Sequence, residues 1–376
     1  MKKIKIAYIL HGLATGGTES FVINVIQRLD SERYDIAIIL AVNEGARQQR
    51  EDEAEKLGVK IYRTNDLDGV QKIASHYSKL ISILKKTGPY DVVHANMDLF
   101  NGINLRAAKK AGVKQRICHA HVPQSQSADQ VGKPFVIRTY QKTMRRLIQN
   151  NATICLGCSE SANEYLYGPD WKMNPRCAVV YNGIDLNKYR MVKVDRETFL
   201  ESNHLPTDRR YIITVGRMSA VKNPLFALDV IKQLHEKNPE YAYLWVGDGE
   251  MRAQVKNRID ELKMNDYVWL LGVRKDIPEV LQVGEAFLLT SIFEAFAIVL
   301  LEGQVSGLPC ICSSSIPRNA DLGRCEFVSL HEGADRWAET IDRCVNRDRQ
   351  PQLDEEKVAS IDAERIAQVM EQYYSM

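Results

Sequence analysis

Two glutamates that flank the start of an expected helix are the first residues of this sequence that could do chemistry. Glu294 follows the apolar run Ala286–Leu289 and stands in the loop before the helix, and Glu302 lies within the first turns of that helix. Free backbone N–H groups at a helix start attract anions, and carboxylates accept hydrogen bonds from hydroxyl groups. The pattern therefore suits a ligand that carries both hydroxyls and phosphates. Two solvated or capping glutamates would give the same spacing.

Two cations occupy a similar position earlier in the chain. Arg217 and Lys222 follow the end of one expected strand and precede the next expected helix. An arginine can hold a diphosphate with its forked guanidinium, and a lysine adds a compact positive charge. The spacing is not that of a Walker loop, because the G-x-x-x-x-G-K-[ST] pattern is absent. The sequence predicts a diphosphate site here, with two ordinary surface cations as the alternative.

A glycine-bearing loop near the N-terminus, Gly12–Glu19, is the third candidate. Small residues such as Gly16 and Gly17 let the backbone approach a ligand closely. The loop lacks the G-x-G-x-x-G fingerprint, and no acidic residue ends a strand about 20 residues further on, so a dinucleotide dehydrogenase is disfavoured. A tight turn without a ligand is the alternative.

These residues need a scaffold, and the chain repeats one pattern of strand, loop and amphipathic helix. Lys3–Leu10 is an expected strand, Phe21–Leu29 has a helical apolar stripe, and the rhythm restarts at Tyr211–Val215. Such alternation indicates parallel sheets covered on both faces. We predict an α/β protein of two doubly wound, Rossmann-like domains that face each other across a cleft. Ligands should bind beyond the carboxyl ends of the strands.

The expected domains follow from where this rhythm restarts. Residues 1–186 should form the first domain and residues 187–360 the second. The last helix, within 361–376, should pack back on the first domain because it is amphipathic.

Composition excludes several other classes of protein. The 376 residues include 50 basic and 48 acidic ones, and a net charge of +2 gives no argument for nucleic-acid binding. There is no apolar run of about 18 residues for a membrane span, and the N-terminal apolar run is too short for a signal peptide. The CxxC at Cys155–Cys158 lacks the second pair that zinc requires. We expect buried free thiols and a cytoplasmic protein.

Five motifs, taken in order, resemble the pattern of glycosyltransferase family 4 on the GT-B fold. They are Gly16-Gly17-Thr18-Glu19, Val180–Asp185, Gly216-Arg217 with Lys222-Asn223-Pro224, Val246–Gly249, and Glu294 with Glu302 followed by Ser306–Pro309. Together they span nearly the whole chain. Segments such as Arg116–His121 and Gly157–Glu160 are similar to those of transferases that build bacterial capsular and exopolysaccharides.

The resemblance implies an enzyme that moves a hexose or N-acetylhexosamine from a nucleotide sugar, with uridine as the favoured base and with retention of anomeric configuration. Arg217 and Lys222 would bind the donor diphosphate, Glu302 the ribose, and Glu294 the hydroxyls of the sugar. The other donor-binding residues it implies are Gly16, Gly17, Val273, Arg274, Phe296, Ala297 and Ile298.

A histidine completes the catalytic set that the resemblance implies. His119 matches the family histidine that faces the donor sugar, and it joins Arg217, Lys222 and Glu294. A structural histidine is the alternative at this position, and His121 is a possible substitute. The leaving phosphate would be stabilised electrostatically, and its oxygen would accept the proton of the acceptor. No DxD motif stands near these strands, so neither a metal nor a further cofactor is expected.

The sequence departs from the family pattern at three positions of the glutamate motif. Ala295 and Ala297 stand where glycine or proline is usual, and Gly303 stands where alanine is usual. If residue 295 required a positive φ, alanine would cost about 1 kcal/mol or more. We expect donor binding with an altered sugar pocket. A non-catalytic nucleotide-sugar-binding partner subunit and a GT-B epimerase are the alternatives.

The stretch 133–150 is a candidate for contact with a membrane that carries the acceptor. It has no acidic residue and has basic residues at Lys133, Arg138, Lys142, Arg145 and Arg146, between apolar residues. A basic amphipathic helix can lie on an anionic membrane surface, which would suit the glycan or lipid-linked oligosaccharide acceptors of the family. An ordinary helix with a solvated basic face is the alternative. The expected location is the cytoplasm, with peripheral contact at the inner face of the cell membrane.

Overall fold

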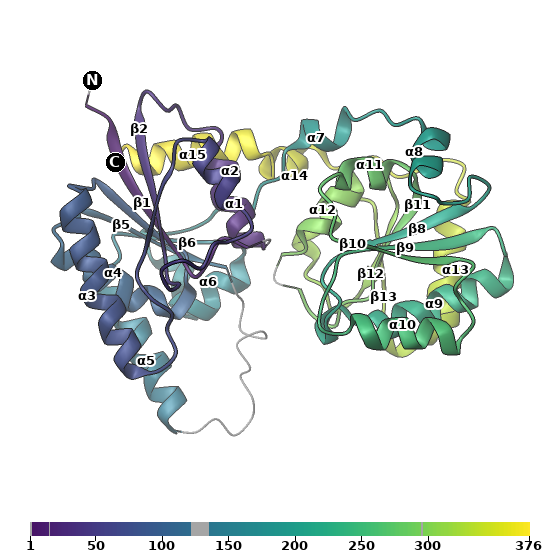
Figure 1. Ribbon diagram of the computed structural model, residues 1–376, viewed down its shortest axis with the longest axis horizontal. Helices are drawn as coiled ribbons and strands as arrows, with labels where there is room; N and C mark the ends of the chain where they lie inside the picture. Colours follow the sequence, from purple (N-terminus) through teal and green to yellow (C-terminus); the bar gives the residue numbers. More distant parts are fainter. Residues whose placement is uncertain (1, 15, 122–134, 295) are drawn as a thin grey trace. The chain divides into compact units, whose positions relative to one another are not determined.

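The computed structural model describes residues 2–14, 16–121, 135–294 and 296–376 (Figure 1). The chain forms two compact units, one of Met1–Gly183 with Ser360–Met376 and one of Ile184–Ala359. The boundary between the two units therefore lies after Gly183, three residues before the expected boundary at residue 186. The reason is close packing, because a Cβ at Gly183 would lie 2.7 Å from Cδ1 of Ile366 in the C-terminal helix.

The first unit is built on a seven-stranded parallel sheet with the order β3-β2-β1-β4-β5-β6-β7. Its strands are β1 (Ile4–Leu10), β2 (Tyr34–Leu40), β3 (Lys60–Arg63), β4 (Val92–Ala95), β5 (Gln115–Ala120), β6 (Ile154–Gly157) and β7 (Cys177–Val179). Its helices are α1 (Gly17–Ile26), α2 (Glu51–Lys56), α3 (Val70–Thr87), α4 (Asn101–Lys110), α5 (Phe135–Asn151), α6 (Glu160–Tyr167) and α15 (Ala363–Tyr374). The winding direction reverses between β1 and β4.

The second unit has a six-stranded parallel sheet with the order β10-β9-β8-β11-β12-β13. Its strands are β8 (Arg210–Val215), β9 (Tyr241–Val246), β10 (Val268–Gly272), β11 (Gly284–Leu289), β12 (Cys310–Ser313) and β13 (Cys325–Val328). The helices of this part of the chain are α7 (Leu186–Arg190), α8 (Arg196–Ser202), α9 (Pro224–Lys237), α10 (Arg252–Glu261), α11 (Ile277–Gln282), α12 (Ile298–Val305), α13 (Gly333–Val345) and α14 (Glu355–Ser360). Here the winding reverses between β8 and β11.

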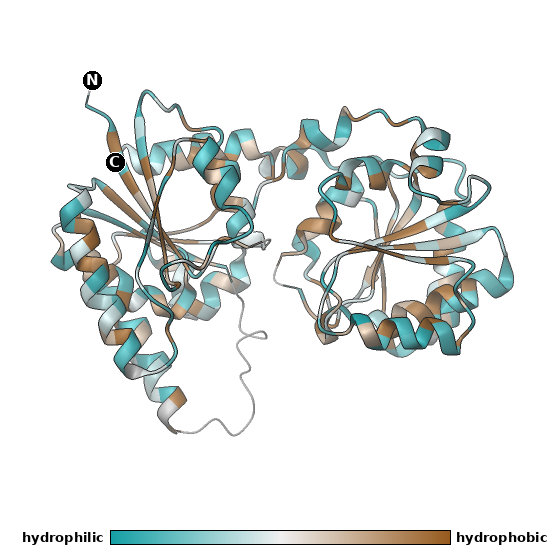
Figure 2. Ribbon diagram, viewed as in Figure 1, coloured by the Kyte–Doolittle hydropathy of each residue, from teal (hydrophilic) through white to brown (hydrophobic). Residues whose placement is uncertain are grey.

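Both sheets are hydrophobic along their central strands, as Figure 2 shows. All six residues of β9 are buried, as are the last five residues of β1, because helices cover both faces of a parallel sheet. The C-terminal helix α15 contributes Ile366, Met370 and Tyr374 to the core of the first unit, next to α1. The predicted class, a doubly wound α/β fold built twice, is confirmed.

Two further expectations concern composition. Within the described ranges, no helix combines the length and the apolar character needed to cross a membrane. All eight cysteines are free thiols, and six of them are buried, including both members of the CxxC pair. They lie among apolar neighbours in and beside the strands, as small hydrophobic residues do.

Candidate active site

The candidate site of the second unit lies where its sheet changes winding direction. Strands β8 and β11 are neighbours, but the chain leaves them in opposite directions, toward β9 and toward β12. The loops that follow such a pair of strands part from each other and leave a crevice at the carboxyl edge of the sheet. The loop after β8 carries Arg217 and Lys222, and the loop after β11 carries Glu294. The topology thus brings together two motifs that are far apart in the sequence.

Lys222 and Glu294 form an ion pair across this crevice. The ammonium of Lys222 donates to Oε1 of Glu294, and the hydroxyl of Ser291 donates to the same oxygen at 2.6 Å. Glu294 is only 8% exposed, so it is not a solvated surface glutamate. The two hydrogen bonds hold one carboxylate oxygen in place and leave the other oxygen as an acceptor.

Backbone contacts join the two loops and fix the position of Lys222. The hydroxyl of Thr290 donates to the carbonyl oxygens of Lys222 and Asn223, at 3.1 and 3.2 Å. The N–H of Ile292 donates to the carbonyl of Val221 at 2.8 Å. Asn223 has a left-handed conformation with φ of 53°, which asparagine tolerates better than most residues. The lysine is therefore carried by a rigid loop.

Arg217 differs from Lys222 because its side chain is exposed. Its guanidinium forms no hydrogen bond or ion pair with the part of the chain that the structure describes. The adjacent backbone is firmly held, since Nε1 of Trp245 donates to the carbonyl of Gly216 at 2.9 Å. Gly247 has φ of 133°, and a Cβ there would lie 2.0 Å from the same carbonyl oxygen. A fixed backbone thus presents a cation whose donors are open to an anionic ligand.

Helix α12 begins at Ile298, close to the expected position, with Ala297 as its N-cap. Ala297 has φ of −66° and no polar side chain to cap the helix, and no side chain of the described residues takes the place of that cap. Phe296 and Ala297 are buried at the start of the helix. The strain expected at Ala295 concerns a position outside the described residues. At Gly303 an added Cβ would lie 3.1 Å from Phe287 and 3.2 Å from Cys310, so these larger neighbours occupy the space of the usual alanine.

Glu302 has a partner that sequence reasoning missed. The hydroxyl of Tyr189 in α7 donates to Oε1 of Glu302 at 2.6 Å. Burial raises the pKa of Glu302 to about 7, against the lowering effect of this hydrogen bond. Tyr189 lies four residues after Asp185, which accepts a hydrogen bond from Lys188 N and caps α7. The motif Val180–Asp185 before α7 was therefore the available signal, but the contact itself joins segments more than a hundred residues apart.

The loop after β10 carries the residues expected near the base. Val273 is 69% exposed, whereas the side chain of Arg274 is tied to its own loop by Asp276 and to Asn203 at 2.7 Å. The N–H of Gly247 donates to the carbonyl of Gly272, which links this loop to the one after β9. The guanidinium of Arg274 is thus occupied, and Val273 with the backbone beside it forms the open surface.

In the first unit, Gly16 and Gly17 follow β1 at the corresponding reversal between β1 and β4. Gly16 is the N-cap of α1 and has an extended backbone, with φ of −133°. A Cβ there would lie 2.4 Å from Oε2 of Glu19, so the space beside Gly16 is filled by that carboxylate. Burial raises the pKa of Glu19.

His119 lies inside β5, one residue before the end of this strand. Its imidazole is fully buried, lies 4.4 Å from the ring of His121 between centroids, and hydrogen-bonds His94. Burial lowers the pKa of all three histidines, to about 3 for His94 and His121, so they are neutral at physiological pH. Neither Nε2 of His119 nor Nδ1 of His121 has a hydrogen-bond partner among the described residues.

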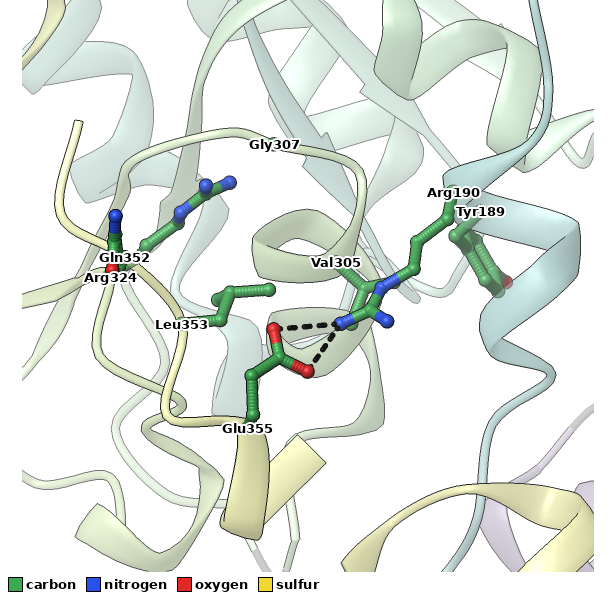
Figure 3. Close-up of a pocket in the computed structure, with 8 residues that line it drawn as sticks. All are labelled: Tyr189, Arg190, Val305, Gly307, Arg324, Gln352, Leu353 and Glu355. Carbon is green, nitrogen blue, oxygen red and sulfur yellow. Dashed lines mark hydrogen bonds and ion pairs between the residues drawn. The ribbon is translucent and has the colours of Figure 1, made fainter. Parts of the chain in front are cut away.

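A pocket of about 430 Å³ lies beyond the other end of α12 (Figure 3). Its lining residues are Tyr189, Arg190, Val305, Gly307, Arg324, Gln352, Leu353 and Glu355. Arg190 and Glu355 point toward each other and form an ion pair at 3.3 Å, and Arg324 donates to the carbonyls of Pro351 and Gln304. These charges are already satisfied, so the pocket lacks the open cation that distinguishes the crevice at β8 and β11.

Comparison with known proteins matches each of the two units to a family of glycosyltransferases. Residues 15–188 match the family described as Glycosyltransferase Family 4, and residues 195–355 match Glycosyl transferases group 1. EpsF of Bacillus subtilis, whose name describes a glycosyltransferase, is 29% identical over 343 residues, which are 91% of this chain and 88% of that protein. The UDP-Gal:alpha-D-GlcNAc-diphosphoundecaprenol alpha-1,3-galactosyltransferase of Escherichia coli is 27% identical and covers 86% of this chain and 83% of its own length.

A solved structure extends the similarity to the fold. Anabaena Alr3699/HepE, solved in complex with UDP and glucose, is similar with a TM-score of 0.74 at 18% identity, over 99% of this chain and 100% of that one. The predicted GT-B fold is confirmed. Because family models match both units in chain order, this protein belongs to the family 4 glycosyltransferases and is a glycosyltransferase enzyme.

Proposed function

We propose that this enzyme transfers a hexose or N-acetylhexosamine from a UDP-sugar to a lipid-linked glycan during the synthesis of a bacterial surface polysaccharide, with retention of anomeric configuration. The observation that carries the proposal is the pairing of Lys222 with the buried carboxylate of Glu294, which joins the loops after β8 and β11, while Arg217 in the first of these loops stays exposed. The choice of donor and acceptor is supported by the E. coli relative, whose name specifies UDP-Gal and a diphosphoundecaprenol-linked sugar.

The proposed mechanism uses one cation that is held in place, Lys222, and one whose guanidinium is open to the donor, Arg217. Arg217 and Lys222, with the first N–H groups of α12, stabilise the negative charge that develops on the leaving diphosphate. A leaving-group oxygen takes the proton of the acceptor hydroxyl, so no separate carboxylate base is required. Neither a metal nor another cofactor belongs to this proposal.

The remaining residues orient the donor. Glu294, held by Ser291 and Lys222, offers its second carboxylate oxygen to a sugar hydroxyl. Glu302 accepts hydrogen bonds from the ribose, and Val273 and Arg274 contribute backbone near the base.

The experiment that tests the donor is a thermal-shift screen against UDP, GDP, ADP and their common sugar conjugates. A ligand that binds only the folded state raises the unfolding midpoint. We expect the largest rise with UDP and UDP-sugars, and a loss of that rise in Arg217→Ala. An equal response to all three nucleotides would contradict a uridine site. The configuration of the anomeric carbon in the isolated product, read from its proton coupling constant, tests retention.

We also propose that α5 contacts an anionic membrane where the lipid-linked acceptor is found. In the described first turns of α5, Phe135 is 82% exposed and Ile137 and Tyr140 are partly exposed, next to the exposed cation Arg138. Further along the helix, Met144 and Ile148 are buried, so only the first half of α5 is free of the core. Exposed apolar residues among basic ones are typical of helices that lie in the membrane interface.

Co-sedimentation with vesicles that contain phosphatidylglycerol tests this contact. Phe135→Ser with Ile137→Ser should reduce binding at low salt, whereas Lys172→Ser, a change of an exposed cation in another segment of the same unit, should not. Binding that is unaffected by the double substitution would exclude α5 as the contact.

A further inference from the structure

Three cysteines lie side by side on one face of the sheet of the first unit. Cys118 of β5 is opposite Cys155 of β6, and Cys155 is opposite Cys177 of β7. Opposite residues of neighbouring strands project to the same face, so the three thiols form a row that ends at the edge strand β7. Cys118 and Cys155 are buried, whereas Cys177 is partly exposed. Cys177 is therefore the member of this row that a solute reaches first.

The outer two thiols of the row are placed so that a disulfide could join them. Neighbouring strands lie about 4.8 Å apart, and the Cα atoms of disulfide-bonded cysteines are about 4.4–6.8 Å apart. Because Cys155 and Cys177 are register partners, their Cα atoms meet this requirement. The two side chains also interact, with the thiol of Cys155 as hydrogen-bond donor and the sulfur of Cys177 as acceptor. An S–S bond would thus replace an existing contact.

The hydrogen bond between the two thiols decides which of them reacts first. It lowers the pKa of Cys177, and the charge of Arg176 acts in the same direction, against the effect of burial. The same bond raises the pKa of Cys155, as burial does. The thiolate is the nucleophilic form of cysteine. Cys177 therefore combines the reactive form with access to solvent, and Cys155 lies beside it as the protonated partner.

The third thiol of the row is withdrawn from this chemistry. Cys118 is fully buried, accepts a hydrogen bond from Nδ2 of Asn101 at 3.4 Å, and has its pKa raised to about 12 by burial. In the described part of the chain, no group of three or more His, Cys, Asp or Glu side chains is arranged to hold a metal ion. The chemistry that the row supports is therefore oxidation of its outer pair.

A second thiol pair, in the other unit, serves as an internal comparison. Cys312 of β12 and Cys325 of β13 also interact. They are not opposite each other, because the register partner of Cys325 is Cys310. Here the partly exposed thiol is the donor, and its hydrogen bond to Cys312 raises the pKa of Cys325. The accessible thiol of this pair is thus held in its unreactive form, unlike Cys177.

We propose that Cys177 and Cys155 are a peroxide-reactive thiol pair that forms a reversible disulfide between β7 and β6. The Cys177 thiolate attacks hydrogen peroxide, so that an S–O bond forms, the O–O bond breaks, and the leaving hydroxide takes up a proton to become water. The sulfur of Cys155 then attacks the sulfenic acid of Cys177. The S–S bond forms, and the hydroxyl group leaves as water with the proton of Cys155.

The electrons of this reaction balance. The two thiols together lose two electrons, and these reduce one molecule of hydrogen peroxide to two of water. A small thiol such as dithiothreitol returns the disulfide to two thiols by exchange. The pair lies within the first unit and does not depend on the identity of the donor or the acceptor.

The test is oxidation of the full-length, folded protein by hydrogen peroxide, followed by alkylation of the remaining thiols and peptide mapping by mass spectrometry. We expect a Cys155–Cys177 disulfide as the first product, loss of two of the eight free thiols, and their recovery with dithiothreitol. Oxidation at Cys325 should be at least about tenfold slower, as for a thiol with a pKa higher by one unit or more. These measurements on wild type require no substitution.

Two variants separate the roles of the two thiols. In Cys155→Ala the sulfenic acid of Cys177 should persist and be trapped by dimedone, whereas the matched variant Cys312→Ala should form the Cys155–Cys177 disulfide at the wild-type rate. Circular dichroism verifies that both variants are folded. A disulfide between Cys118 and Cys155, oxidation of Cys325 as fast as that of Cys177, or oxidation of Cys177 in wild type to sulfinic acid without a disulfide would overturn the proposal. A Cys177 that stays reduced would overturn it as well.

Discussion

The hydroxyl of Tyr189 lies 2.6 Å from Oε1 of Glu302 and donates a hydrogen bond to it. The carboxylate belongs to the predicted nucleotide site, and the tyrosine comes from the first helix of the second unit. Burial raises the pKa of Glu302 to about 7, and the Tyr189 bond opposes that rise. The protonation of this group therefore changes within the physiological pH range.

Nucleotide binding should depend on pH through Glu302. The ionised carboxylate accepts hydrogen bonds from the ribose hydroxyls more strongly than the protonated group does, so the Kd for UDP should fall as pH rises from 6 to 8. Glu302→Gln should remove this part of the pH dependence, and Tyr189→Phe should move its midpoint to higher pH. Isothermal titration calorimetry at several pH values measures both. The remaining slope in Glu302→Gln reports the ionisation of the nucleotide itself.

The free energy of unfolding should fall as pH rises, because of the same residue, Glu302. The folded-state pKa of Glu302, about 7, lies above the ordinary value of 4.5, so the folded protein binds this proton more tightly than the unfolded chain. Its contribution to stability is full below pH 4.5 and is lost as pH rises through about 7. Glu302→Gln should therefore gain about 2 kcal/mol over wild type between pH 5 and pH 8, after allowance for solvent screening of a half-buried group. Urea unfolding at the two pH values provides the comparison, and a constant difference would contradict the raised pKa.

Substitutions of Lys222 and Glu294 should have non-additive effects on the free energy of unfolding. Lys222→Met leaves a buried carboxylate without its cation and should cost about 2–3 kcal/mol of unfolding free energy, and Glu294→Gln should also destabilise. The double variant should be less destabilised than the sum of the two, with a coupling of about 1 kcal/mol or more. Denaturant titrations of the four proteins complete the cycle. Additive effects would show that the two side chains do not interact in solution.

Substitution of Arg217 should weaken nucleotide binding without changing the stability of the fold. Because its guanidinium is exposed, Arg217→Ala should leave the unfolding midpoint almost unchanged. The same change should weaken UDP binding at least tenfold, about 1.4 kcal/mol, since a charge-assisted contact to the diphosphate is lost. Uridine, which lacks the phosphates, should bind both proteins equally. Equal weakening of uridine and UDP would place Arg217 away from the diphosphate.

Two glycines at the ends of β9 and β10, Gly247 and Gly272, offer a matched test of backbone fit. Gly272 has φ of 68° with open space beside it, so Gly272→Ala should cost about 1 kcal/mol for the left-handed conformation alone. Gly247 has φ of 133°, and its Cβ would also lie 2.0 Å from the Gly216 carbonyl. Gly247→Ala should therefore cost about 3 kcal/mol or more and displace the loop that carries Arg217. Chemical unfolding and UDP titration of both variants check the order, and equal costs would contradict the close approach.

The amino-acid sequence by itself determined the class of the fold and the order of the motifs. Alternating strand and helix patterns predicted both parallel sheets, because buried parallel strands and amphipathic helices have different periods of hydrophobicity. The start of α12 could be predicted as well, since Ala297 and Ile298 follow a loop between an apolar strand and an apolar stripe. Such signals are local, and each is contained within one segment.

Tertiary structure alone decided which of these residues meet. The pairing of Lys222 with Glu294, the hydrogen bond from Tyr189 to Glu302 and the hydrogen bonds that His94 forms with Tyr374 and His119 join segments far apart in the chain. No spacing rule in the sequence predicts these contacts, because the order of strands in a sheet decides which loops become neighbours. Tertiary structure also decided burial. Arg217 is exposed whereas Glu294 is buried, and the pKa of Glu302 rises to about 7, because desolvation depends on everything that packs around a group.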